Sequence, residues 1–160
     1  VTATDDPAAV RVEVLHQLDT FRRLMGSDPT HLDSHQHVHR SRPIAAIVAE
    51  IAERLAVPVR HGSASRYVGS FYGQDSKGEP LDNLITVDSL IGTLRGLPAG
   101  TTELGCHPGL RSDAPGMYII EREQEANVLC DPRVRSTIET EEIRLMSFRD
   151  LAPGDSSIEP

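Results

Sequence analysis

Five side chains that could bind a metal ion stand at alternate positions of one short segment, residues 31–39. In chain order they are His31, Asp33, His35, His37 and His39. Alternate side chains of an extended strand point to the same face, so a strand would gather four imidazoles and one carboxylate there. Such a face is of little use for packing, but neutral imidazole and carboxylate are the usual ligands of divalent metals. The segment therefore predicts a metal-binding or catalytic site.

A solvated histidine-rich loop is the alternative interpretation of this segment. The aspartate at the same period of two, and the helical pattern that follows, favour the metal or catalytic interpretation. A site on one strand normally takes one or two ligands from that strand, and other strands supply the rest. The remaining side chains would then fix the orientation of a ligating histidine or contact a substrate.

Helical and strand patterns alternate along the rest of the chain. Apolar residues recur at helical spacing, between recognisable start and stop residues, over 7–25, 43–55, 87–97, 119–130 and 132–140. Short apolar runs predict strands near 30–36, 57–61, 101–106 and 143–147. The polar segment 62–83 reads as a long functional loop. This alternation predicts an α/β fold with parallel strands.

Ligands of such folds bind beyond the carboxyl ends of the strands. His107 ends the strand predicted over 101–106 and precedes a Pro108-Gly109 turn, which makes it a candidate acid or base. A plain turn residue is the alternative. Arg60 ends the neighbouring predicted strand, where it could hold a polar or anionic substrate group or pair with one of the many carboxylates.

Composition narrows the classes of function. The 160 residues fit one domain of ordinary size, and the net charge of −8 argues against nucleic acid or an anionic membrane as partner. No apolar run is long enough for a transmembrane helix, and the first residues do not resemble a signal peptide. The two cysteines, Cys106 and Cys130, show neither metal-site spacing nor a disulfide framework, so a reducing, cytoplasmic setting is expected.

Two motifs together resemble a known family. The segments Thr30-His31-Leu32-Asp33-Ser34-His35-Gln36-His37-Val38-His39 and Glu103-Leu104-Gly105-Cys106-His107-Pro108-Gly109 are similar to signatures of the YdjC-like (ChbG/HpnK) carbohydrate deacetylases. The resemblance extends over about residues 7–151, so one family domain is expected over 1–151, followed by a polar tail at 152–160. It implies a (βα) barrel-like fold, a divalent metal ion, with Mg²⁺ favoured over Zn²⁺, and hydrolysis of an N-acetyl group from an amino sugar.

The resemblance also implies roles for single residues. His35 is then the metal ligand, and His107 is the catalytic acid or a histidine that contacts the substrate. The residue pattern itself makes Asp33 a further catalytic candidate. The expected substrate contacts or orienting partners are His31, His37, His39 and Arg60.

The sequence departs from the family at two motifs. The family carries an Asp-Asp-Phe-Gly strand end with a metal-binding or catalytic aspartate, and a Gly-x-His-x-Asn-like segment with a second metal-binding histidine. Neither is in this sequence, where Asp5-Asp6 is followed by Pro7. We therefore expect the C-terminal part of the family only, with an incomplete barrel. Exposed edge strands would then invite pairing with another chain, which allows a homo-oligomer.

Two other functions remain open at this stage. Another metal-dependent hydrolase, such as a phosphoesterase or an amidohydrolase, would also place His and Asp at strand ends, and two bound metals would favour it. An inactive fragment or accessory pseudoenzyme would keep the scaffold without the chemistry.

Overall fold

A computed structural model describes residues 5–62, 65–74, 81, 83–110 and 118–151. The chain divides into two compact units. The first unit comprises Val1–Arg66 and Met146–Pro160, and the second unit comprises Tyr67–Leu145. Within the described ranges, no helix combines the length and the apolar character that a membrane span requires.

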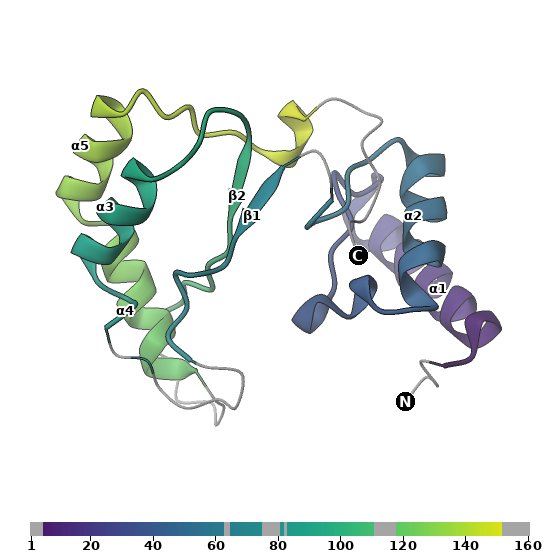
Figure 1. Ribbon diagram of the computed structural model, residues 1–160. Coiled ribbons are helices and arrows are strands. Elements are labelled where there is room, and N and C mark those ends of the chain that lie inside the picture. Colours follow the sequence, from purple (N-terminus) through teal and green to yellow (C-terminus); the bar gives the residue numbers. More distant parts are fainter. Residues whose placement is uncertain (1–4, 63–64, 75–80, 82, 111–117, 152–160) are drawn as a thin grey trace. The chain divides into compact units, whose positions relative to one another are not determined.

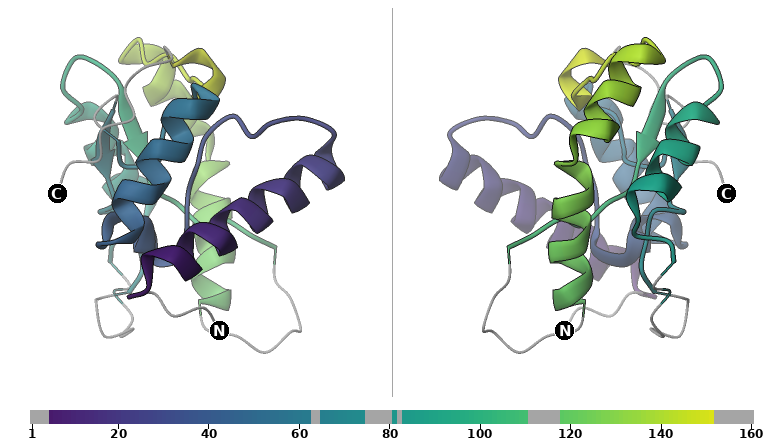
Figure 2. Two further views of the ribbon diagram at one scale, coloured as in Figure 1. Left: turned by 90° about the vertical axis from the view of Figure 1, so that its right-hand side faces the viewer. Right: turned by 90° about the vertical axis from the view of Figure 1, so that its left-hand side faces the viewer.

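The first unit is built on two helices, α1 (Pro7–Met25) and α2 (Ile44–Leu55) (Figure 1). The α1 helix begins at the residue that the sequence predicts. The Asp6 carboxylate accepts hydrogen bonds from the backbone N–H groups of Ala8 and Ala9, and Pro7 takes the first helical position. It ends at Gly26, whose φ of 68° suits glycine. Figure 2 shows α1 lying across α2.

The core of the first unit is the contact between these helices and one extended segment. Its buried residues are Val10, Leu18, Ile44, Ile47, Val48, Ile51, Ala52 and Val59. Val59 also forms an isolated parallel bridge with Leu32, in which the Leu32 N–H donates to the Pro58 carbonyl and the Arg60 N–H to the Leu32 carbonyl. This bridge joins the start of the histidine segment to the segment that carries Arg60.

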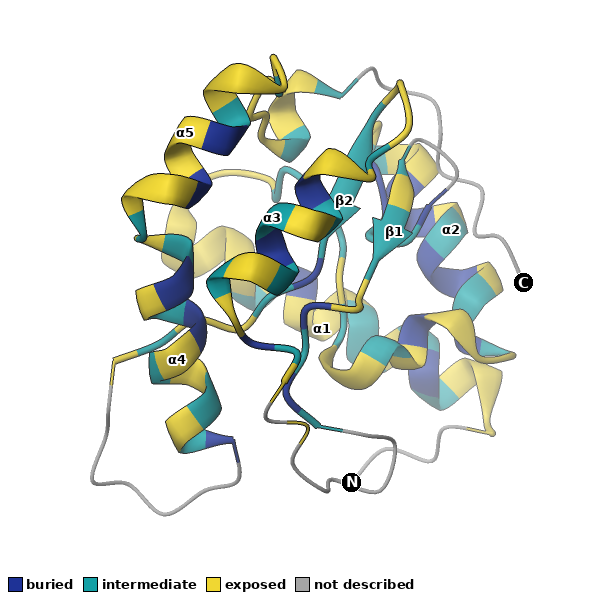
Figure 3. Ribbon diagram, turned by 60° about the vertical axis from the view of Figure 1, so that its left-hand side comes forward, coloured by how far each residue is buried: buried dark blue, intermediate teal, exposed yellow. Residues whose placement is uncertain are grey.

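The second unit combines three helices with a two-stranded sheet. The strands are β1 (Arg66–Val68), which begins at the boundary of the units, and β2 (Thr102–Leu104). The helices are α3 (Val87–Arg95), α4 (Ile119–Leu129) and α5 (Pro132–Thr140). Buried residues lie along one side of α3 and α5, and α3 packs against both α4 and α5 (Figure 3). The buried core residues are Phe71, Ile85, Leu90, Leu94, Tyr118, Val128 and Val134.

The structure confirms an α/β fold with parallel pairing, but the described residues do not show a barrel. The prediction of a strand at 30–36 is wrong beyond the Leu32 bridge, because a 3₁₀ helix, η1 (His35–Arg40), begins at His35. Positive φ values at Gln36 (52°) and His37 (55°) are incompatible with an extended strand.

Three further expectations need correction. The segment at 57–61 pairs only at Val59, and 143–147 forms no strand. Leu145 is 76% exposed, whereas Ile143 packs against the core of the second unit, so only part of this apolar run is buried. The short β1 strand lies inside the segment that we expected to be a loop, 62–83. The predicted tail at 152–160 lies outside the described residues.

Candidate functional site

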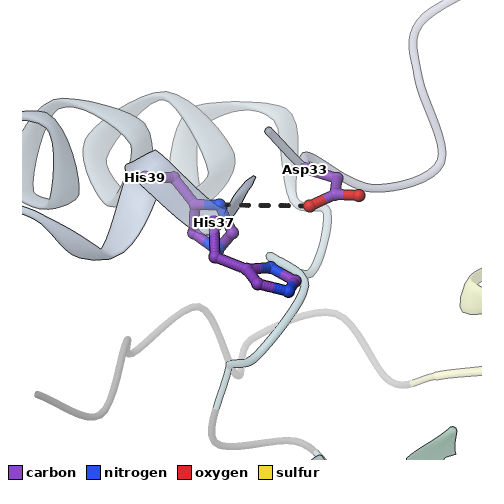
Figure 4. Close-up of side chains that lie close together, drawn as sticks. All are labelled: Asp33, His37 and His39. Carbon is purple, nitrogen blue, oxygen red and sulfur yellow. Dashed lines mark ion pairs between the residues drawn. The ribbon is translucent and has the colours of Figure 1, made fainter. Parts of the chain in front are cut away.

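Three of the five alternating side chains come together in the first unit. Asp33, His37 and His39 each offer one ligand atom, and these atoms lie within 4.8 Å of one another (Figure 4). Ligands of one ion with bonds of about 2.0–2.2 Å lie roughly 3–4 Å apart, so the cluster is close to the spread that a shared ion needs. The turn of η1 makes this grouping, whereas an extended strand would have spaced the residues along its length.

His39 is fully buried, and both of its ring nitrogens have assigned partners. The Nε2–H donates to the Arg60 carbonyl at 2.9 Å, which leaves Nδ1 as the nitrogen with the lone pair. The Ser34 hydroxyl donates to Nδ1 at 2.7 Å and accepts the His39 backbone N–H at 3.0 Å. Nδ1 also lies 4.0 Å from the Asp33 carboxylate. Histidines that bind metals commonly donate their other ring N–H to a carbonyl, as His39 does here.

Asp33 is held as a carboxylate by its neighbours. Arg60 Nη1 donates to Oδ2 at 2.9 Å, and the Ser34 backbone N–H donates to Oδ1 at 2.7 Å. Partial burial raises the pKa of Asp33, but the hydrogen bonds from Arg60 and Ser34 and the charges of Arg60 and His39 outweigh it and hold the pKa below its usual range. Of the two roles considered for Arg60, pairing with a carboxylate is the one observed.

His61 is a neighbour of this cluster that was not among the predicted site residues, although it ends the strand predicted at 57–61. Its ring packs edge-on against His37 with centroids 4.5 Å apart, and its φ is 61°. Burial, followed by the charges of His37, Arg40, His39 and Arg60, lowers the pKa of His61 to about 4. The imidazole is therefore neutral at pH 7. The sequence signal was its place directly after Arg60, at the end of a predicted strand. The parallel Leu32–Val59 bridge brings residues just after 59 beside those just after 32.

Two of the predicted site histidines of the first unit lie outside this cluster. His35 is exposed at the first position of η1 and is not among the three clustered side chains. His31 stacks on Phe148 of the same unit, with ring centroids 4.1 Å apart, and its Nδ1 contacts the Thr30 hydroxyl at 3.0 Å.

His107 belongs to the second unit. It follows β2 by three residues, its side chain is exposed, and its ring lies edge-on to Tyr72 with centroids 5.4 Å apart. Tyr72 in turn stacks on Tyr118 at 4.6 Å. The motif predicted the place of His107 at the end of a strand, but it gave no sign of these aromatic neighbours.

Comparison with known proteins identifies the family. A model of the family described as "YdjC-like protein" matches residues 1–140. The chain belongs to the YdjC-like protein family. This confirms the resemblance drawn from the two histidine motifs.

Several relatives of the chain carry names that state an activity. It is 29% identical to a carbohydrate deacetylase of Clostridium beijerinckii, covering 89% of this chain and 61% of the relative. It is 30% identical to a carbohydrate deacetylase of Geobacillus stearothermophilus, with coverages of 87% and 58%. It is 30% identical to a chitooligosaccharide deacetylase of Klebsiella pneumoniae, with coverages of 87% and 61%. The chain thus spans about three fifths of the length of the curated relatives it matches.

A solved structure supports the fold of the family member. A protein of Enterococcus faecalis named for a cellobiose-phosphate cleavage function superposes with a TM-score of 0.76 at 22% identity. The match covers 92% of this chain and 62% of that one. At this identity the likeness shows the fold alone.

Proposed function

We propose that this chain carries part of the active site of a metal-dependent carbohydrate deacetylase, which hydrolyses the N-acetyl group of an amino sugar. The observation that carries the proposal is the Asp33–His37–His39 cluster, found in a member of a family whose named relatives are carbohydrate and chitooligosaccharide deacetylases. The reaction consumes water and an acetamide and releases acetate and a sugar amine.

The donor set fits a divalent cation. Asp33 is ionised because its pKa is held low, and the bond from His39 Nε2–H to the Arg60 carbonyl presents Nδ1 towards the carboxylate. Asp33, His37 and His39 would hold the ion. Two imidazoles and one carboxylate suit Zn²⁺ better than Mg²⁺, which prefers oxygen ligands, so the donor chemistry favours the metal that sequence resemblance ranked second. A bound divalent cation would polarise the acetamide carbonyl and lower the pKa of a water molecule.

The proposed reaction needs a base that deprotonates water and an acid that protonates the leaving amine. Asp33 is a weak base because its pKa is low, so it serves better as a ligand than as the group that deprotonates water. The family's Asp-Asp-Phe-Gly segment, which this sequence does not contain, is the expected source of that base. His107 is exposed, and its imidazole is a group that can protonate the leaving amine.

Acetate release tests the proposal. We would assay a chitooligosaccharide with this chain alone and with this chain fused behind a segment of a family member that carries Asp-Asp-Phe-Gly. The fusion should release acetate, lose this activity on chelation and regain it with Zn²⁺. In the fusion, His107→Ala should abolish most of the activity, whereas His16→Ala, at an exposed position of α1, should not.

Three outcomes would contradict the proposal. Strong release by the chain alone that requires Asp33 would make Asp33 the base. Turnover of a phosphate ester in place of the acetamide would favour the phosphoesterase alternative. A folded fusion that binds metal but releases no acetate would favour a pseudoenzyme.

A further inference from the structure

Among the described residues of the second unit, Glu125 on α4 is a fully buried carboxylate, with 0% of its surface exposed. Burying a carboxylate is costly unless its oxygens accept hydrogen bonds. Here Oε2 accepts the backbone N–H of His107, and Oε1 accepts the hydroxyl of Tyr118. The candidate acid of the reaction is therefore tied through its backbone to a carboxylate that the solvent does not reach.

Tyr118 fixes Glu125 from the other side. Its hydroxyl oxygen accepts the Gly73 backbone N–H at 2.9 Å while its O–H donates to Glu125. Burial and the bond to Glu125 raise the pKa of Tyr118, so the hydroxyl keeps the proton that it donates. Tyr118 also holds a φ of 65°, which is uncommon for a bulky aromatic residue and persists only where the surroundings determine it.

The turn after His107 has a second attachment to the same helix. The Gly109 backbone N–H donates to the Arg122 carbonyl at 3.1 Å. Arg122 and Glu125 lie three positions apart on α4, hence on adjoining turns of one face. The His107-Pro108-Gly109 turn is thus held at both ends, while the imidazole itself stays exposed beside Tyr72.

We propose that Glu125 is a positioning residue for His107: its carboxylate, oriented by Tyr118, fixes the backbone from which the imidazole reaches the leaving amine. The structural half of this inference depends only on the second unit. The catalytic half rests on the proposed function. Misplacement of a reacting group by about 1 Å can cost roughly a hundredfold in rate, which is the scale of effect expected here.

Nuclear magnetic resonance of the imidazole groups tests the structural half in the chain itself, without any activity. The aromatic rings of Tyr72 and Tyr118 lie 5.4 and 6.2 Å from the His107 ring, centroid to centroid, and should shift its imidazole C–H signals away from those of exposed His16. Glu125→Leu removes both carboxylate acceptors at similar side-chain volume. We expect the chemical shifts of the His107 imidazole to move to those of a solvent-exposed histidine. Glu125→Gln keeps an acceptor for the His107 N–H and should largely restore them. Glu123→Leu, on the same helix, is the matched control and should leave them unchanged.

A variant that fails to fold would disturb every histidine signal at once. In that case, exchange of the His107 backbone amide in Glu125→Gln decides, because the neutral amide is a weaker acceptor than the carboxylate. We expect this amide to exchange several-fold faster than in the wild type. Unchanged exchange and unchanged imidazole signals in both Glu125 variants would overturn the inference.

Kinetics of the active fusion test the catalytic half. Glu125→Leu should lower kcat about a hundredfold, change KM little and cause no further loss when His107 is already alanine. Additive losses in the double variant would mean that Glu125 acts independently of His107, and would overturn the inference. Full activity of His107→Ala would instead refute the acid assigned in the proposed function, and the magnetic resonance result would then judge the positioning of His107 by itself.

Discussion

The Asp33–His37–His39 cluster and the His107 turn place histidines in opposite ways. In the cluster, the functional groups themselves are held: His39 is buried, its ring is bonded at both nitrogens, and Asp33 is paired with Arg60. At the turn, the imidazole is exposed and the backbone is held, through Glu125 and the Arg122 carbonyl.

The difference follows from the chemistry that each region would perform. A metal ligand must keep its orientation and its protonation state, so its donors benefit from a buried, hydrogen-bonded setting. A general acid must meet substrate and exchange protons with solvent, so it is better exposed on a rigid support. The contrast predicts that substitutions in the two regions affect different measurements.

Loss of the acid should give the largest effect. In the active fusion, His107→Ala should lower the rate of acetate release by about a hundredfold to ten-thousandfold, the usual worth of general-acid help. Metal affinity, measured by calorimetry, should remain within about twofold of the wild type. A large fall in metal affinity would show that His107 is itself a ligand, and the contrast between the two regions would disappear.

Loss of a clustered ligand should affect metal binding first. Asp33→Asn and His39→Ala should each weaken Zn²⁺ binding by more than the roughly ten- to hundredfold that an orienting partner is worth. His35→Ala is the matched variant, since His35 lies on the same segment but outside the cluster, and it should leave the affinity within a few-fold. The reverse ranking would restore the ligand assignment that the family resemblance implies for His35.

Local sequence signals predicted the helices of both units well. Asp6, Pro7 and Gly26 bound α1, and Asp131 and Pro132 begin α5, because capping and proline geometry act within a few residues. In the histidine segment, periodicity predicted a strand where the structure has the 3₁₀ helix η1. Its turn at Gln36 and His37 is stabilised by contacts with Ser34 and with the distant Arg60 carbonyl.

The same distinction applies to the candidate site. The motif named Asp33, His37, His39 and His107, because their side-chain chemistry is visible in the sequence. Glu125 was missed because a glutamate in a helix is usually solvated, and its burial depends on Tyr118 and on the turn at His107.

The Arg60–Asp33 pair should contribute modestly to the stability of the cluster. The pKa of Asp33 is lower in the folded chain than in the unfolded chain, where it is about 3.9. The stability that the ionised Asp33 contributes is therefore complete above the unfolded pKa and is lost as the pH falls through the folded pKa. At pH 7, Arg60→Gln should lower the free energy of unfolding by about 1 kcal/mol, a figure already reduced for solvent screening. Urea unfolding with chelator present measures it.

The matched control for this pair is Arg11→Gln, which breaks the exposed Arg11–Glu50 ion pair of the same unit. It should cost less than Arg60→Gln, because exposed pairs are well screened. Equal effects would mean that the Asp33 carboxylate is no better held than a surface group.

His61 should give the smallest effect, a pH dependence with a defined sign. Its folded pKa of about 4 lies below its usual value of 6.5, since burial and the nearby His37, Arg40, His39 and Arg60 oppose its charge. As the pH falls from 6.5 towards 4, the unfolded chain binds a proton at this position and the folded chain does not, so stability is lost across that window.

His61→Asn removes this titration and suits the positive φ. From pH 7 to pH 4.5, its free energy of unfolding should therefore fall less than that of the wild type, by under about 1 kcal/mol after solvent screening. His16→Asn, at an exposed helical position, should keep the wild-type slope. If both variants kept the wild-type dependence of unfolding free energy on pH, the His61 imidazole would titrate as an ordinary surface group. The buried setting inferred for this edge of the cluster would then be wrong.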